Sequence, residues 1–387
     1  MQTDPLSVTI GGIRVTGDTL FEKVAAFGQH TVGTLEVLIP GGISPWVAPE
    51  WTPVTLRLTD GRVSEPWYGY VHHGGVVATT YGQRNAVVRY TLIGTSLPMN
   101  DEKTRSWKNV TRSSIVRQIA KEHRLRTLMS IHRTVIPYYA QSSSDWRVLK
   151  DMADQTGYRL WVDGSTVRFV DAKVLLEGVS VSETPTFSQS VTPGVLNTLH
   201  QFESKIGTMV PRAGGTAANQ VVNGIDVRNK TIIKATSTTS TQNSGSPAGS
   251  TPVLHKVNTG IRVSQYGQAS ELVSSASINT QGWLTASAVV TGSPSLEPGS
   301  IIDIEGNRIP ADQHGLWLVT KATQRVMREE PDPRYVYTTL LELERDQFYS
   351  PTFRSNYKTT NTRDSVGATM RDGLFWEADY MEDINVG

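Results

Sequence analysis

The side chains that most often carry catalysis or bind metals are scattered along this sequence. Its eight histidines stand at positions 30, 72, 73, 123, 132, 200, 255 and 314, and none has the HExxH, HxH or histidine-carboxylate spacing of a zinc site. On a strand, the neighbouring His72 and His73 would point to opposite faces, which argues against a shared metal. The chain contains no cysteine, so disulfides, thiolate metal sites and a cysteine nucleophile are excluded. The sequence therefore predicts no bound metal and no cofactor.

Pairs of carboxylates are the other chemistry to consider. Asp101 with Glu102, and Asp151 with Asp154, resemble the paired acids of a glycosidase. Asp151, however, lies one helical turn after Arg147 and can pair with it, while the other acids stand near the ends of predicted elements. No GxSxG elbow, P-loop or GxGxxG motif after a strand is present. We therefore expect no enzymatic activity and no catalytic residue.

Composition favours a β-rich chain of several domains. Its 387 residues are too many for one ordinary domain, and its 33 Gly and 19 Pro are typical of many turns between short strands. The 37 basic and 36 acidic residues create no overall field toward nucleic acid or an anionic membrane. The residues Met1–Pro5 lack a signal-peptide pattern and no run of eighteen apolar residues occurs, so we expect a protein made in a cytoplasm, with no membrane span.

The first region, residues 1–99, has the alternation of antiparallel strands. Val54, Leu56 and Leu58 share one face of a strand, and the Asp60-Gly61 turn leads to a second strand. This pattern predicts an antiparallel barrel or sandwich.

The middle region, residues 100–172, predicts a compact α+β domain. Its apolar spacing changes to a helical period over Thr111–His123. A second helix is expected after Ser142, whose hydroxyl can cap it with Asp145 three residues on, and Gly157 is placed to end that helix. Two strands then flank Asp163-Gly164, a strong hairpin signal.

The rest of the chain returns to strands. Residues 173–195 are predicted to be a connector, and 196–348 a second β region that contains one short helix at Ala269–Ala276. Within it, residues 236–252 are almost wholly polar and are expected to form a mobile loop. The polar residues 349–387 are predicted to be an extended C-terminal tail.

The two β regions share a strand pattern. Each places an alternating strand, an acidic-Gly turn and a Trp-bearing strand in succession: Val54–Leu58 with Asp60-Gly61 and Trp67, then Ile301–Ile304 with Glu305-Gly306 and Trp317. The pattern is open to two interpretations, ordinary antiparallel turn usage or a diverged internal duplication. With a duplication, three copies of the chain would present six similar barrels around one axis.

The order of these features resembles a known family. The helix and hairpin features of residues 104–171, followed by Ala269–Ala276, Leu296–Gly299 and Gly315–Val319, are similar to the late-control protein D family of phage baseplate hubs and to the hub part of type VI secretion spikes. The resemblance implies a β-rich α+β fold, with two tube-like antiparallel β-barrels, an inserted α+β domain and a smaller extra domain.

The same resemblance implies a structural role at the tail tip of a virion. A homotrimer would form a pseudo-sixfold ring that joins the tail tube to the distal spike or fibre. Expected partners are a distal tail protein or tube ring, the tape-measure protein and spike or fibre proteins, with DNA only as transiting cargo. In the tail, Phe375, Trp376, Tyr380, Met381 and Ile384 lie among acids and are predicted to dock on a neighbouring tail-tip protein.

A carbohydrate- or peptidoglycan-binding module is the alternative. The small α+β region at 100–172 also resembles glycan-binding LysM modules. Among the tryptophans, only Trp46 and Trp51, in a Pro-rich loop, suit stacking on a sugar, because Trp146, Trp161 and Trp317 fall at predicted core positions.

Overall fold

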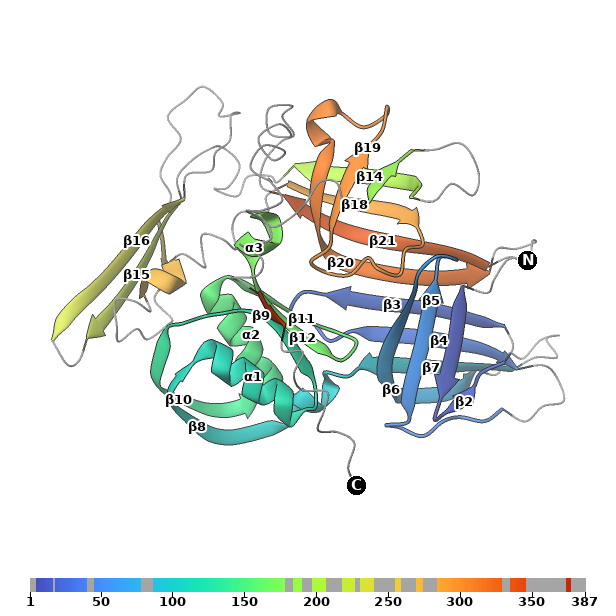
Figure 1. The fold of residues 1–387 in the computed structure, drawn as a ribbon, viewed down its shortest axis with the longest axis horizontal. Helices are drawn as coiled ribbons and strands as arrows, with labels where there is room; N and C mark the ends of the chain where they lie inside the picture. The colour runs from blue at the N-terminus through green and yellow to red at the C-terminus, as the bar shows by residue number, and fades with distance from the viewer. Residues whose placement is uncertain are drawn as a thin grey trace.

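A computed structural model of the chain confirms the β-rich α+β fold, with α-helices packed among long antiparallel strands (Figure 1). The description covers residues 5–16, 18–39, 45–77, 86–177, 184–189, 197–206, 218–226, 230–239, 255–258, 269–273, 284–328, 335–345 and 374–376.

The first lobe is built from the first seven strands. Along the sheet they run in the order β3, β4, β7, β6, β5, β1, β2, and their alternating inward side chains form one core that includes Leu35, Leu56 and Leu92. Strand β6 is long and bends at a bulge between Val71 and His73. The strands are β1 (Leu6–Ile10), β2 (Ile13–Arg14), β3 (Thr19–Ala26), β4 (Val32–Ile39), β5 (Pro53–Thr59), β6 (Ser64–Val77) and β7 (Ala86–Gly94).

The second lobe surrounds its own core, which includes Phe187, Ile302 and Trp317. Its strands run in the order β14, β18, β21, β20, β19, β13, and one isolated bridge joins Ser188 of β13 to Thr198, the residue before β14. The strands are β13 (Thr186–Ser188), β14 (Leu199–Ile206), β18 (Leu284–Thr291), β19 (Ile301–Glu305), β20 (Gly315–Arg328) and β21 (Tyr335–Arg345). Because β13 lies within residues 173–195, that segment is more than a connector.

Six strands have the same order in both lobes. Across the sheet, the first lobe has the order β3, β4, β7, β6, β5, β1, and the second lobe has the order β14, β18, β21, β20, β19, β13. If the six strands of each lobe are numbered along the chain, both orders are second, third, sixth, fifth, fourth, first. The two sets differ at one pairing, since β1 joins β5 antiparallel and β13 joins β19 parallel. This common arrangement confirms the strand pattern expected from the sequence and favours the duplication over ordinary turn usage.

Strand β20 belongs to both lobes. Its first residues pair with β19, and after a bulge between Val319 and Lys321 its residues Lys321–Val326 pair with β3 of the first lobe. Strand β21 lines the other edge of β20 along nearly its whole length. The lobes are thereby joined into one continuous sheet, visible where β3 lies beside β20 (Figure 1).

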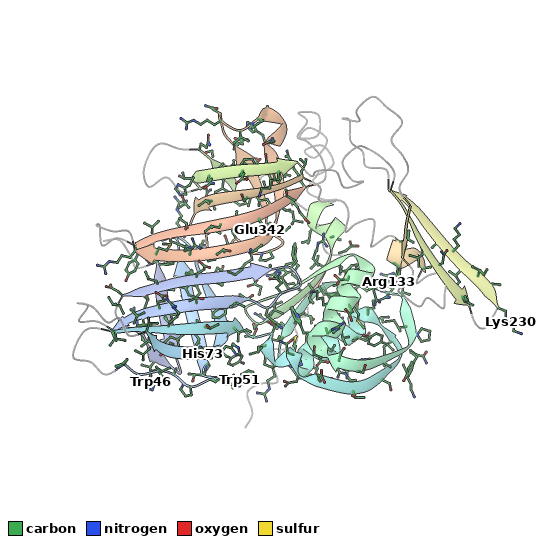
Figure 2. The ribbon with its side chains drawn as sticks, turned by 180° about the vertical axis from the view of Figure 1, so that it is seen from behind. Trp46, Trp51, His73, Arg133, Lys230 and Glu342 are labelled. Atoms are coloured by element: carbon green, nitrogen blue, oxygen red, sulfur yellow. The ribbon has the colours of Figure 1, made fainter. Side chains whose placement is uncertain are left out.

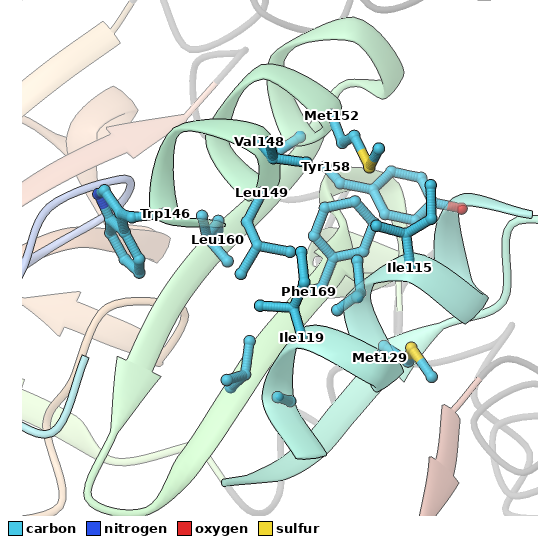
Figure 3. Packing of buried hydrophobic residues seen from close by; sticks show 14 of the residues in the cluster. Ile115, Ile119, Met129, Trp146, Val148, Leu149, Met152, Tyr158, Leu160 and Phe169 are labelled. Atoms are coloured by element: carbon cyan, nitrogen blue, oxygen red, sulfur yellow. The ribbon is translucent and has the colours of Figure 1, made fainter. Parts of the chain in front are cut away.

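Two helices cover a small sheet to make the α+β domain. The apolar faces of α1 and α2 pack on β9, β11 and β12, with Ile119, Leu149 and Phe169 at the centre (Figure 3). The elements are η1 (Leu97–Asn100), β8 (Glu102–Thr111), α1 (Arg112–Glu122), β9 (Arg126–Ser130), β10 (Val135–Ser144), α2 (Asp145–Thr156), β11 (Tyr158–Asp163), β12 (Thr166–Asp171) and α3 (Ala172–Glu177). Strands β8 and β10 form a separate antiparallel pair.

The helix ends follow local chemistry, with one correction. Thr111 caps α1 by accepting the Ser114 amide, and Gly157 ends α2 in the left-handed region, as expected. The cap of α2 is Ser144, which accepts the Arg147 amide, and the prediction of Ser142 was wrong. Strand β10 pairs with β8 through Ser144, so the chain stays extended for two residues longer than the cap motif suggested.

A separate three-stranded sheet is formed by residues that lie between β14 and β18 in the sequence. Strands β15 (Ala218–Asp226), β16 (Thr231–Thr239) and β17 (His255–Asn258) pair with one another and pack on a helical turn at 269–273. The predicted mobile loop 236–252 therefore begins inside a strand, because Thr236–Thr239 belong to β16, and its remainder lies outside the described residues. The other two elements are η2 (Ala311–Gln313) and β22 (Leu374–Trp376).

Val326 offers a test of how far β20 stabilises the first lobe. It is fully buried in the core of that lobe, although it lies in the second β region of the sequence. We predict that Val326→Ala lowers the free energy of unfolding by about 2 kcal/mol, through lost burial and a cavity. Hydrogen exchange should show weaker amide protection in β4 and β7. The exposed Val336→Ala on β21 is the control and should change neither quantity.

Candidate assembly site at the junction of the two lobes

The junction between the lobes combines a strand ladder with ion pairs. Arg325 of β20 lies 2.6 Å from Glu22 of β3, directly across the ladder. Buried Lys23 forms an ion pair with Glu297, and burial raises the pKa of that carboxyl although the Lys23 ammonium opposes the shift. Because one face of the junction is closed to water, its side chains fix the register of β3 on β20.

The loops that lead into β5 and β19 are equivalent, bond for bond. In the first lobe the Trp51 amide donates to the Val71 carbonyl at 2.8 Å, and the Val71 amide donates to the Thr52 carbonyl at 2.9 Å. In the second lobe Gly299, Val319 and Ser300 repeat both bonds, each at 2.9 Å. Both Trp51 and Gly299 have positive φ, at 66° and 90°. The two lobes therefore share backbone geometry as well as strand order.

Each core contains a Phe-Trp contact, and its phenylalanine is at an equivalent position in the two lobes. Phe21 on β3 lies 6.5 Å from Trp67 on β6, and Phe202 on β14 lies 5.7 Å from Trp317 on β20, measured between ring centroids. Strand pairing puts Phe21 opposite Leu35 and Phe202 opposite Ala288, which are equivalent positions of β4 and β18. The equivalence thus extends to the two phenylalanines, whereas the two tryptophans stand at different positions of their strands.

The α+β domain contacts both lobes. The turn between β3 and β4 reaches into it: the Gly28 amide donates to the Leu160 carbonyl at 2.7 Å, and the His30 ring stacks on Trp146 with centroids 4.3 Å apart. Burial lowers the pKa of His30, although a hydrogen bond with Asn100 opposes that shift, so His30 is neutral at pH 7. On the other side Arg159 lies 3.4 Å from Glu344 of β21.

A charged cluster ties β8 to both helices of this domain. Asp145, fully buried at the start of α2, receives bonds from Lys103 and Arg105, each at 2.6 Å, and lies 2.9 Å from His123. Burial by itself would raise the pKa of the Asp145 carboxyl. Hydrogen bonds from three neighbours and the charge of Arg105 outweigh burial, so this pKa lies well below its usual range. The cluster is structural, since every charge in it faces a partner.

The sequence contained a signal for this cluster that motif searching misses. Lys103 and Arg105 stand two residues apart on one strand and therefore share a face. The alternation is visible in the sequence, but the carboxylates Glu122 and Asp145 come from two separate helices. Only the packed domain brings the four groups together.

The described residues contain no metal-binding cluster. No group of three or more His, Cys, Asp or Glu side chains that could hold a metal occurs among them. In the α+β domain Trp107, Trp146 and Trp161 are all buried, so none presents an open ring to a sugar. Trp46 and Trp51 are 54% and 50% exposed and lie on the first lobe instead (Figure 2).

Two of the predicted docking residues lie on a strand of their own chain. Phe375 and Trp376 belong to β22, which pairs antiparallel with β9 opposite Met129 and Leu128. Tyr380, Met381 and Ile384 lie outside the described residues. The docking of this segment on a neighbouring protein stays a prediction.

Solved structures with the same fold are phage tail proteins. A 43 kDa tail protein of prophage MuSo2 from Shewanella oneidensis matches with a TM-score of 0.64 at 12% identity, over 89% of this chain and 99% of that one. A tail protein from Neisseria meningitidis MC58 matches with a TM-score of 0.63 at 11% identity, over 88% and 96%. The fold is shared with phage tail proteins. The resemblance inferred from the sequence is confirmed at this level.

The likeness extends to secretion machinery. An E. coli component of the type VI secretion system, described as structurally similar to T4 bacteriophage tail proteins, matches with a TM-score of 0.53 at 13% identity, over 89% of this chain and 77% of that one. No family model and no curated protein matches the sequence. No helix in the described part of the chain is long and apolar enough to cross a membrane.

Asp145 provides a stability test with a defined pH dependence. Asp145→Asn should lower the free energy of unfolding by about 3 kcal/mol, because it removes the buried carboxylate charge that accepts hydrogen bonds from Lys103 and Arg105. Since the folded-state pKa is depressed, the ionised group stabilises the fold above its ordinary pKa and loses this effect progressively as the pH falls below about 5. Denaturant titrations from pH 7 to 3 should show the two proteins converging at acid pH.

The control for this test is Glu102→Gln, next to Lys103 on β8. Glu102 is exposed and should change stability by less than about 0.5 kcal/mol. A constant difference between Asp145→Asn and the parent at every pH would contradict the assigned role of the cluster.

Proposed function

We propose that this chain is a structural hub protein of a phage tail tip or a related injection machine, and that it catalyses no reaction. Three copies form a ring whose six lobes are arranged with pseudo-sixfold symmetry. The observation that carries the proposal is the repeated six-strand arrangement, joined side by side through β3 and β20. A trimer of such chains can meet a sixfold tube with similar contacts at all six positions.

The remaining architecture is consistent with a load-bearing part. The lobes are joined by a strand ladder instead of a linker, and the α+β domain contacts both of them. The ring would join the tail tube, or a distal tail protein, to the spike or fibre below it. Its channel would pass the tape-measure protein and then DNA, which is cargo and not a bound ligand.

Oligomeric state tests this proposal directly. The purified chain should have three times the 42.5 kDa mass of one copy when measured by light scattering at micromolar concentration. Micrographs of particle tips should show a ring with threefold symmetry and six peripheral lobes. A stable monomer in solution, together with particles that lack such a ring, would overturn the proposal.

The C-terminal segment can be tested separately from the ring. Deleting residues 350–387 should leave the trimer mass unchanged but reduce incorporation into particles, because it removes the aromatic and aliphatic side chains that are proposed to contact a neighbouring tail-tip protein: Phe375, Trp376, Tyr380, Met381 and Ile384. Incorporation is measured by immunoblot of purified particles. A shorter deletion of residues 378–387 keeps β22 and shows whether Phe375 and Trp376 suffice. Normal incorporation of the longer deletion would refute the docking role.

A further inference from the structure

Each lobe has two strand edges of the kind that meet at the junction. Within the chain, each lobe pairs through only one of its two edges. Within the chain, β3 pairs with the second half of β20. The equivalent of β3 is β14, and the equivalent of that half of β20 is His73–Val77 of β6. Among the described residues, β14 pairs only with β18, and His73–Val77 pairs only with β7. Within the described part of the chain, the edges of β14 and of His73–Val77 that correspond to the junction are therefore unpaired.

The register of the missing pairing follows from the pairs already present. Thr323 of β20 lies opposite Val24 of β3. Counting from the bulge in each long strand, Gly75 takes the place of Thr323, since Gly75 pairs with Arg89 as Thr323 pairs with Leu340. Lys205 takes the place of Val24, because Lys205 stands three residues after Phe202 as Val24 stands three after Phe21. Gly75 and Lys205 would face each other.

Side chains at the open edges are less buried than their counterparts. Phe21 is 2% exposed beneath the β20 pairing, whereas the equivalent Phe202 on β14 is only partly buried. Gln324 on β20 is fully buried, whereas the equivalent Val76 on β6 is 45% exposed. Val76 faces the same side of the sheet as the core residue Val88, with which it pairs. Each difference is the one expected if a strand is missing from that edge.

Large aromatic side chains accompany the open half of β6. Trp51, whose amide is bound to Val71 next to the bulge, and Trp46 are both about half exposed. Figure 2 shows Trp46, Trp51 and His73 on the same part of the first lobe. Exposed tryptophans are over-represented where protein surfaces bind one another. The open edge thus carries both backbone groups and apolar area for a partner.

From these observations we infer that β14 of one copy pairs antiparallel with His73–Val77 of β6 in the next copy, with Lys205 opposite Gly75. This contact repeats the β3–β20 junction between chains. It is head to tail, so it closes into a ring when the rotation per chain is one third of a turn. Unpaired strand edges are suited to such addition, because their amides and carbonyls are already aligned. The inference rests on the proposed trimer and adds the residues that make its contact.

Cross-linking tests the proposed register of β14 on β6. The native chain contains no cysteine, so only the introduced thiols can react. The double variant Gly75→Cys with Lys205→Cys is treated with dibromobimane, which joins thiols only at short distance. A Cβ at Gly75 meets no atom within 4 Å, and the Lys205 side chain is exposed, so both thiols are accessible. Covalent species of two and three chains are expected on denaturing gels.

Controls for the cross-link use the same strands. Each single variant should give only one-chain bands. Gly75→Cys with Ser204→Cys should give far less cross-linking, because a shift of one residue moves the second thiol to the other face of the sheet.

A second variant measures the contact without a cross-linker. Val76→Asp places a charge where the ring would bury an apolar side chain, and should weaken self-association by about tenfold or more. Val63→Asp is the matched control, since Val63 is 40% exposed and lies in the turn before β6. It should leave the trimer mass unchanged.

The outcomes separate this inference from the proposed function. A trimer that gives no cross-link between positions 75 and 205, and that is indifferent to Val76→Asp, would overturn the strand pairing and leave the hub proposal standing. A native chain that stays monomeric would overturn both. Cross-linking with loss of association in Val76→Asp alone supports the contact.

Discussion

The structure depends on the two edges of one strand. Every backbone amide and carbonyl in a buried strand needs a partner, and β20 finds partners in both lobes. The bulge between Val319 and Lys321 divides it into a part that pairs with β19 and a part that pairs with β3. Because a ladder of hydrogen bonds defines both distance and direction, the lobes have one relative orientation. A flexible linker could not impose this.

The two lobes show which features of a repeated module depend on backbone geometry and which do not. Strand order, the bulge in the long strand and the paired bonds at Trp51 and Gly299 recur in both. The identity of the side chains varies more than the backbone geometry. Trp67 and Gly69 of β6 correspond to Gly315 and Trp317 of β20, so tryptophan and glycine have exchanged positions. A Cβ at Gly69 would overlap the Trp67 ring, so one of the two positions must lack a side chain. Core volume is conserved without sequence identity.

Two buried charged groups, Asp145 and Lys23, are held by partners inside the protein. Its most perturbed carboxyl group, Asp145, is held by cations from β8 and by His123, and its buried Lys23 is matched by Glu297 across the lobe junction. Such groups stabilise one arrangement of elements, since removing any partner would leave a buried charge. The exposed apolar side chains Trp46, Trp51 and Val76 belong to the first lobe, and others lie on the α+β domain and on strands β15 and β16.

The sequence by itself determined what local rules control. Apolar alternation predicted strands such as β5 and β6 in the first lobe and β19 and β20 in the second, the helical period predicted α1, and Gly157 predicted the end of α2, because each depends on neighbours a few residues away. Local rules failed at Ser142, where pairing with β8 kept β10 extended, and at 236–239, where polar residues still complete a ladder with β15. Only the tertiary structure decided that β20 pairs with β3 and that Lys103 meets Asp145. These contacts join residues about 300 and about 40 positions apart, and no periodicity in a single chain encodes which distant edge a strand will meet.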